Sequence, residues 1–146
     1  MAYKSKTVAA LLAFALGTLG GHRFYLYGPR DAFGWLHLLG TLLGIDGWRL
    51  LTHSQLMSPL GWALTICGAV SLFSSLLAAI VYGLRPDEAW NSRFNSQSLR
   101  KSRSGWSAIL IVSASLFIGA GLMMFGFVVG FQTYFETHLP PNSLSQ

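Results

Sequence analysis

Hydrophobic residues occur along the chain in four runs separated by short polar breaks. None of the runs alternates apolar and polar positions with the period of two that marks a strand, so helices are predicted throughout. A helix needs about 20 residues to cross roughly 30 Å of hydrocarbon. The pattern predicts an all-α polytopic membrane protein with four transmembrane helices, arranged as one hairpin over residues 4–52 and a second over residues 59–131. The runs cover residues 8–21, 32–51, 60–84 and 106–131.

The first run, of about 14 residues, is short for a helix that crosses a bilayer. Lys4 and Lys6 precede it, so the start of a cleaved signal peptide is the alternative interpretation. The residues that follow lack a small-residue cleavage site, which favours a retained membrane segment. Such a segment either crosses a thinned bilayer or enters and leaves on the same side.

Composition excludes several classes of protein. Hydrophobic residues make up 52% of the 146 residues and charged residues 10%, against about 25% charged in soluble domains. A water-soluble globule and a disordered chain are therefore excluded. The net charge of +5 comes from cations between the apolar runs, which indicates membrane topology rather than nucleic-acid binding. The single cysteine, Cys67, excludes an intrachain disulfide and is interpreted as a small packed hydrophobe.

Positive charges predict the orientation of the chain. The loops 22–31 and 85–105 together hold seven Lys and Arg, so the positive-inside rule places both in the cytoplasm, most simply at a bacterial inner membrane. With four crossings both termini lie outside, whereas a re-entrant first segment puts the N-terminus inside. Anionic lipid headgroups are the expected partners of the cations near residue 101. The seven are Arg23, Arg30, Arg85, Arg93, Arg100, Lys101 and Arg103.

The 85–105 loop contains a predicted helix of its own. Pro86 is followed by two acidic residues, a typical helix start. Trp90, Arg93 and Phe94 then share one face at spacings of three and four. This pattern predicts a short helix lying at the lipid headgroups, and docking of a partner protein is the alternative.

Glycines recur four residues apart in three of the apolar runs. Glycines at this spacing share one helix face and let a neighbouring backbone approach closely. The pairs predict helix packing, either inside the bundle or with a second copy or another membrane protein. They are Gly17 with Gly21, Gly40 with Gly44, and Gly126 with Gly130.

The segment from Gly20 to Arg30 is the most distinctive in the chain. Two adjacent glycines predict that the first helix ends in a left-handed turn. Arg23 is expected to reach lipid phosphates or helix carbonyls. A rigid interfacial turn is the favoured role of this segment and a binding epitope the alternative. The motif consists of His22, Arg23, Phe24 and Tyr25.

Over residues 4–52 the chain resembles the TM2 domain family, in which a two-helix hairpin module turns toward the cytoplasm. The motif at His22 falls where eukaryotic members carry Asp-Arg-Phe. Tyr27 replaces a usual glycine, and Asp46 precedes Trp48 instead of following it. The resemblance implies a fold and a membrane location, but no shared activity. It is carried by residues 4–14, Leu16-Gly17, residues 20–26, Gly34 and Leu38-Leu39.

Asp46 is a carboxylate inside an apolar run, where charge is costly and normally has a partner. Arg49, three residues later, predicts a local ion pair, with Gly44 and Gly47 breaking the helix and lifting the pair to the interface. His37 is placed roughly on the same face, so a relay for protons or ions is the alternative.

No catalytic, cofactor-binding or metal-binding residues are predicted. The histidines His22, His37, His53 and His138 lack i, i+4 spacing, and no phosphate loop or zinc-protease motif occurs. The predicted function is a non-enzymatic scaffold or accessory subunit that packs with itself or with a larger membrane complex. The alternative is a small ion or proton channel or transporter that uses His37 and Asp46.

Overall fold

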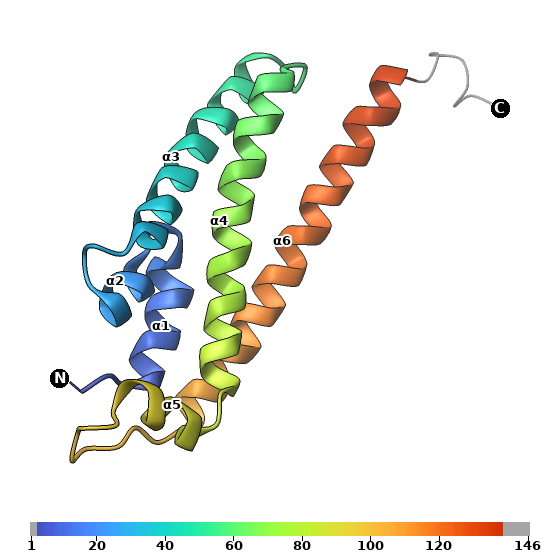
Figure 1. The fold of residues 1–146 in the computed structure, drawn as a ribbon. Helices are drawn as coiled ribbons and strands as arrows, with labels where there is room; N and C mark the ends of the chain where they lie inside the picture. The colour runs from blue at the N-terminus through green and yellow to red at the C-terminus, as the bar shows by residue number, and fades with distance from the viewer. Residues whose placement is uncertain (1–2, 139–146) are drawn as a thin grey trace.

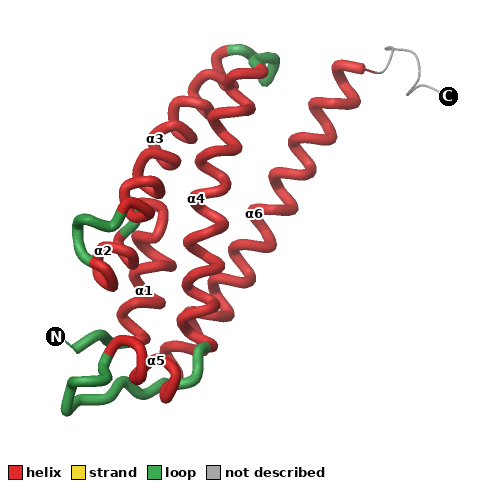
Figure 2. The backbone as a smooth tube through the Cα atoms, viewed as in Figure 1, coloured by secondary structure: helices red, strands yellow, loops and turns green. Residues whose placement is uncertain are grey.

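In the computed structural model, which describes residues 3–138, the chain is a bundle of helices joined by short turns (Figure 2). No strand occurs within these residues, so the all-α prediction is confirmed. The elements are α1 (Lys6–Leu16), the 3-10 turn η1 (Gly17–Leu19), α2 (Gly21–Tyr27), α3 (Ala32–His53), α4 (Pro59–Leu84), α5 (Asp87–Phe94) and α6 (Trp106–His138).

Helix α4 is the centre of the bundle, and α1, α3 and α6 all pack against it (Figure 1). Its start is fixed by Ser58, whose side chain accepts a hydrogen bond from Gly61 N, and by Pro59 in the first turn. It ends at Leu84, and the next residue, Arg85, is extended because Pro86 follows. Because helices of both predicted hairpins pack on α4, the two hairpins meet at this helix.

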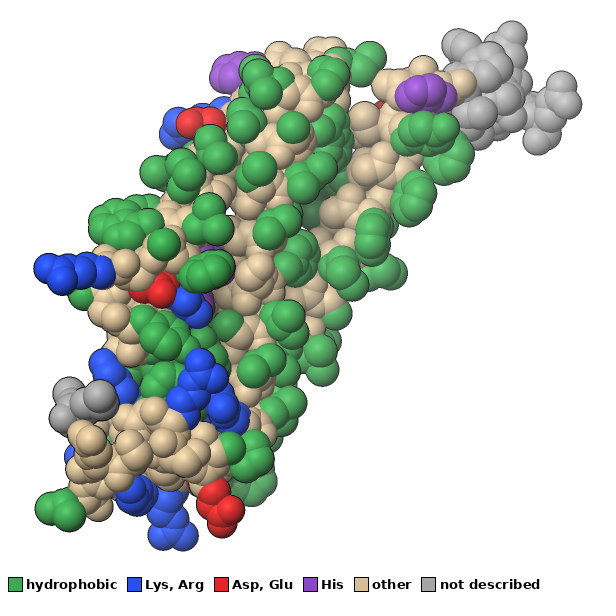
Figure 3. Space-filling view, in the orientation of Figure 1, with side chains coloured by type: hydrophobic (Ala, Val, Ile, Leu, Met, Phe, Trp, Pro, Cys, Tyr) green, Lys and Arg blue, Asp and Glu red, His purple; other side chains and the backbone are tan. Residues whose placement is uncertain are grey.

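Within the described residues, two helices are long and apolar enough to cross a membrane, α4 with 26 residues and α6 with 33. The prediction of four transmembrane helices is therefore not confirmed. Helix α1 has 11 residues, about 16 Å at 1.5 Å per residue, which is half the thickness of the hydrocarbon. Large apolar side chains cover much of the outer surface of the bundle, as lipid contact requires (Figure 3).

The first apolar run breaks at Gly20, which has the left-handed φ of +76° that was expected there. A Cβ at this position would also lie 2.3 Å from the Gly34 carbonyl oxygen, so glycine is required twice over. After the break α2 returns toward the start of α1, where the Tyr25 hydroxyl accepts from Ser5 N at 2.9 Å. The segment is a helical hairpin that turns back on itself.

The start of α1 lies at the same end of the bundle as the 85–105 loop (Figure 1). Lys6 Nζ is 2.6 Å from Asp87 Oδ1, and Lys4 N donates to Asn95 Oδ1 at 2.8 Å. The expectation that the N-terminus lies at the end opposite the 85–105 loop is therefore wrong.

Helix α3 runs unbroken through Gly44 and Gly47, so the predicted break near Asp46 is wrong. Both glycines serve packing instead. A Cβ at Gly44 would lie 2.6 Å from Gly68 Cα of α4, and one at Gly47 would lie 2.4 Å from Thr65 N. The two helix backbones touch at these positions, as small residues allow in membrane helices.

Candidate functional site

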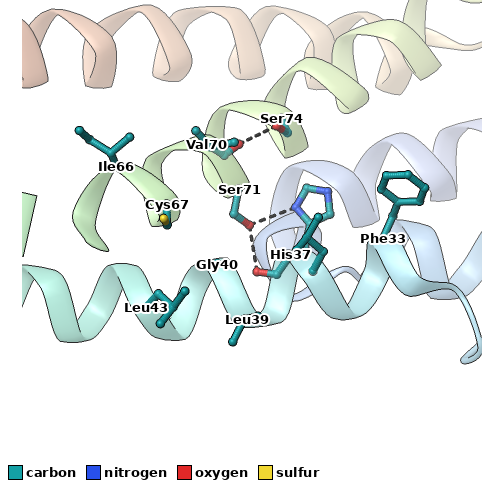
Figure 4. Close-up of a pocket in the computed structure, with 11 residues that line it drawn as sticks. Phe33, His37, Leu39, Gly40, Leu43, Ile66, Cys67, Val70, Ser71 and Ser74 are labelled. Carbon is teal, nitrogen blue, oxygen red and sulfur yellow. Dashed lines mark hydrogen bonds between the residues drawn. The ribbon is translucent and has the colours of Figure 1, made fainter. Parts of the chain in front are cut away.

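Polar side chains gather inside the bundle at mid-length of α4. His37 Nδ1 of α3 and Ser71 Oγ of α4 are 3.0 Å apart, and Ser71 Oγ also donates to the His37 carbonyl at 3.0 Å (Figure 4). Next to them the Thr41 hydroxyl donates to the Thr18 carbonyl at 2.7 Å. These bonds join η1, α3 and α4 and satisfy polar groups that lie between the packed helices.

A second histidine lies beside this cluster. The rings of His22 and His37 meet edge-on with centroids 5.2 Å apart, and the Tyr82 ring lies 5.9 Å from His22. His22 is 1% exposed, and its Nδ1 has no hydrogen-bond partner among the described residues. The sequence did not indicate this pair, because only the chain reversal at Gly20 brings α2 against α3.

A crevice of about 450 Å³ opens between α3 and α4 beside the cluster (Figure 4). Its walls are mostly apolar, and its polar groups are His37, Ser71 and Ser74. Cys67 also lines it and is exposed, so the interpretation of this cysteine as a packed core residue is wrong. The apolar walls include Phe33, Leu36, Leu39, Leu43, Ile66 and Val70.

The predicted interfacial motif is organised by an ion pair. Arg23 donates to both carboxylate oxygens of Asp31, each at 2.9 Å, and stacks over the Tyr27 ring at 4.5 Å. Asp31 also caps α3 by accepting from Gly34 N at 2.9 Å. The guanidinium was expected to contact lipid phosphates or helix carbonyls. It instead holds α2 to the start of α3.

The N-terminus is held by a buried charge cluster that we call the N-terminal clamp, formed by Lys6, Asp87 and Ser104. Lys6 is 1% exposed, and its ammonium donates to Asp87, to Ser104 and to the Arg85 carbonyl. Burial of Asp87 opposes its ionisation, but hydrogen bonds from Lys6 and Ser104 outweigh burial and lower the pKa of Asp87 to about 2. The sequence indicated Lys6 only as part of a possible signal-peptide start.

Helix α5 covers the end of the bundle and is a helix as predicted. The expectation that Trp90 lies among lipid headgroups is wrong, because its ring is fully buried against Phe94 and Tyr82. Its Nε1 donates to the Lys4 carbonyl at 2.9 Å. Trp90 therefore ties the loop to the N-terminal segment.

Asp46 and Arg49 are 3.5 Å apart, with side chains 66% and 72% exposed. The structure does not bring His37 to this pair. Nine residues correspond to about two and a half turns, so the two positions face opposite sides of α3. A relay that passes through both His37 and Asp46 has no geometric basis.

The three glycine pairs have different surroundings. Gly40 and Gly44 both face α4, whereas Gly17 and Gly21 lie in different helices and share no face. A Cβ at Gly126 or Gly130 would meet no atom of the described residues within 4 Å. Close helix contact inside the chain thus involves only some of the predicted positions.

Among residues 3–138 no group of three or more potential metal ligands occurs. In comparisons with known proteins, the family model of the TM2 domain matches residues 2–48. No curated protein and no solved structure matches the chain. The match covers α1 and α2 and most of α3, the elements that form the hairpin and the His37 side of the crevice.

Proposed function

Residues 2–48 are a TM2 domain in a membrane protein, and from this premise we propose that the chain is a non-enzymatic scaffold or accessory subunit. It packs with a second copy or with another membrane protein. The observation that supports this best is the far half of α6, which has no partner within the described part of the chain.

Helix α6 leans away from α4 toward its C-terminal end (Figure 1). Its buried residues are Ala108 and Ser115, and none is buried from residue 116 to 138. A cleft of about 570 Å³ separates this half from the start of α4, with Gly130 and Thr133 on one wall and Trp62 on the other. Small residues on such a wall permit the close backbone contact by which membrane helices associate.

The distribution of charge supports an orientation. We propose three crossings, by α3, α4 and α6, with the α1–α2 hairpin entering and leaving on the cytoplasmic side of a bacterial plasma membrane. Nine of the ten Lys and Arg then belong to that side, where they meet anionic headgroups, and only Arg49 belongs to the other. Figure 3 shows most Lys and Arg atoms near the end formed by α5 and the N-terminus.

Cysteine crosslinking in native membranes tests the packing. In a Cys67→Ala background, Gly130→Cys places a thiol on the open face of α6, and Val128→Cys places one on the opposite face as a matched control. Gly130→Cys is expected to give a crosslinked dimer or a heavier adduct, identified by mass spectrometry, and Val128→Cys a much weaker one. Equal yields, or no adduct at either position, would contradict the proposal.

A channel or transporter is the second candidate, supported by the His22–His37 pair and the hydroxyl groups around it at mid-length of α4. Flux of protons or ions into liposomes tests it. His37→Ala is expected to abolish flux, and the exposed Asp46→Asn to leave it unchanged. Absence of flux in the wild-type protein would discard this candidate.

A further inference from the structure

His22 is a titratable group that the folded hairpin encloses without a partner. Its side chain is 1% exposed, and its Nδ1 has no hydrogen-bond partner among residues 3–138. A buried polar group that lacks a hydrogen bond costs free energy, and a buried charge without a counter-charge costs more. His22 therefore stays neutral as long as α2 remains packed against its neighbours.

The groups that face His22 do not offer it a free counter-charge. On α3 the ring of His37 meets it edge-on with centroids 5.2 Å apart, and on α4 the ring of Tyr82 lies 5.9 Å away. On α2 itself Arg23 is a neighbouring positive charge. Asp31, at the start of α3, already accepts from Arg23 with both carboxylate oxygens. A proton added to His22 thus creates a charge that the packed site does not neutralise.

His37 cannot take up this proton at low cost either. The Ser71 hydroxyl gives its one proton to a backbone carbonyl, that of His37 or of Thr18, so its oxygen accepts from His37 Nδ1. The proton of neutral His37 is therefore on Nδ1, and Nε2 carries the lone pair. A second proton on His37 would place a charge beside the buried ring of His22 and would oppose protonation of that ring, because like charges repel.

We propose that His22 is a proton sensor that releases α2 from α3 and α4 when the cytoplasmic side becomes acidic. Burial, with His37 and Arg23 adding to it, lowers the pKa of His22 in the packed hairpin from 6.5 to about 4. Released into water, the same ring has an ordinary pKa of about 6.5. The released form therefore binds the proton more tightly, and below about pH 6.5 it gains up to tenfold in population for each pH unit.

Release of α2 would reach the end of the bundle that α5 covers. The Tyr25 hydroxyl accepts from Ser5 N at 2.9 Å, and the Tyr25 carbonyl accepts from the Lys4 ammonium. Lys4 N in turn donates to Asn95, directly after α5. The sensor thus acts on a surface that faces the cytoplasm in the orientation proposed above. It rests on that orientation for the side on which acid is sensed, and it does not depend on the packing face of α6.

Hydrogen–deuterium exchange of the full chain in nanodiscs, read by mass spectrometry, tests the sensor. His22→Phe is the matched variant, because its ring occupies similar space but takes no proton. Dividing the wild-type exchange rate by that of the variant at equal pH removes the intrinsic pH dependence of exchange. For residues 21–27 this ratio is expected to rise about tenfold between about pH 7.5 and about pH 5.5. An unchanged ratio would overturn the proposal.

Further variants identify the group responsible. His22→Gln repeats the comparison with a smaller side chain that does not titrate, in case phenylalanine disturbs the packing. His37→Asn keeps an amide donor for Ser71, and its acid response is expected to persist, as is that of His53→Phe at the exposed far end of α3. Loss of the response in His37→Asn would assign the proton to His37 and overturn the role of His22. An equal acid response in α4, the internal reference, would mean general unfolding and would overturn the proposal as well.

Discussion

The interface between α3 and α4 and the far half of α6 carry the same glycine spacing but use it differently. In α3 the space left by each missing side chain is filled by α4, with Gly44 against Gly68. In α6 the space beside Gly126 and Gly130 is open. The spacing thus indicates where a backbone can be approached, while the neighbour decides whether the contact is made within the chain.

The same contrast holds for the ion pairs. The N-terminal clamp encloses Lys6 almost completely, whereas Asp46 and Arg49 remain mostly exposed. A charge that has lost its water depends on its partner, but an exposed charge does not. Both comparisons can be tested with matched substitutions.

The largest effect is expected for Gly44→Leu. Its Cβ alone would lie 2.6 Å from the Gly68 backbone, so α3 and α4 must separate. We expect a loss of at least about 3 kcal/mol in the free energy of unfolding, measured by circular dichroism during denaturation in detergent. The same change at Gly126 is the control and is expected to be neutral or slightly stabilising, because leucine favours helix over glycine. Similar losses at both positions would show that the contact with α4 does not set the cost of the substitution.

Asp87→Asn is expected to have the next largest effect. It leaves the Lys6 ammonium buried without a counter-charge, which costs about 2 kcal/mol, less than the roughly 3–5 kcal/mol of a fully buried pair because Asp87 is 36% exposed. The neighbouring exposed acid provides a control, since Glu88→Gln should change stability little. Loss of the clamp should also speed proteolysis at the N-terminus. Equal stability of the two variants would contradict the enclosed role of Lys6.

Acid should weaken the clamp in a defined range. The pKa of Asp87 is lowered from 3.8 to about 2 in the folded chain, so its contribution is complete above pH 3.8 and is lost as the pH falls toward 2. The free energy of unfolding should decline over this range in the wild-type protein, by about 1 kcal/mol after screening by solvent. Asp87→Asn should lack this component. An identical acid dependence in both proteins would show that another group is responsible.

The smallest effect is expected for Asp46→Asn. Because both side chains of this pair are more than half exposed, removing it should change the unfolding free energy by less than about 0.5 kcal/mol. Thermal denaturation alongside the Asp87→Asn protein measures the difference. A loss as large as that of Asp87→Asn would mean that Asp46 has a partner outside the chain.

Local pattern predicted the long helices well. The run 60–84 became α4 and the run 106–131 became most of α6, because apolar length and the proline at Pro59 are encoded in neighbouring residues. The reversal after α1 was only partly predicted. The two glycines indicated a left-handed ending, but the close contact of Gly20 with Gly34 that requires it is made between separate helices.

The candidate site was mostly beyond the reach of local pattern. His22 and His37 meet only after the hairpin folds, and Lys6 meets Asp87 across 81 positions of sequence. No spacing rule covers such pairs. The placement of Asp46 with His37 was a different kind of error, because helical periodicity alone puts them on opposite faces.

The closure of the N-terminal clamp has a consequence for biogenesis. When the ribosome has made α1, the carboxylate that will neutralise Lys6 is still about 70 residues from being synthesised. The ion pair of Lys6 with Asp87 therefore forms only after α3 and α4 have been made. Truncation before α5 would leave Lys6 without its counter-charge, while Ser5 would keep its bond to Tyr25.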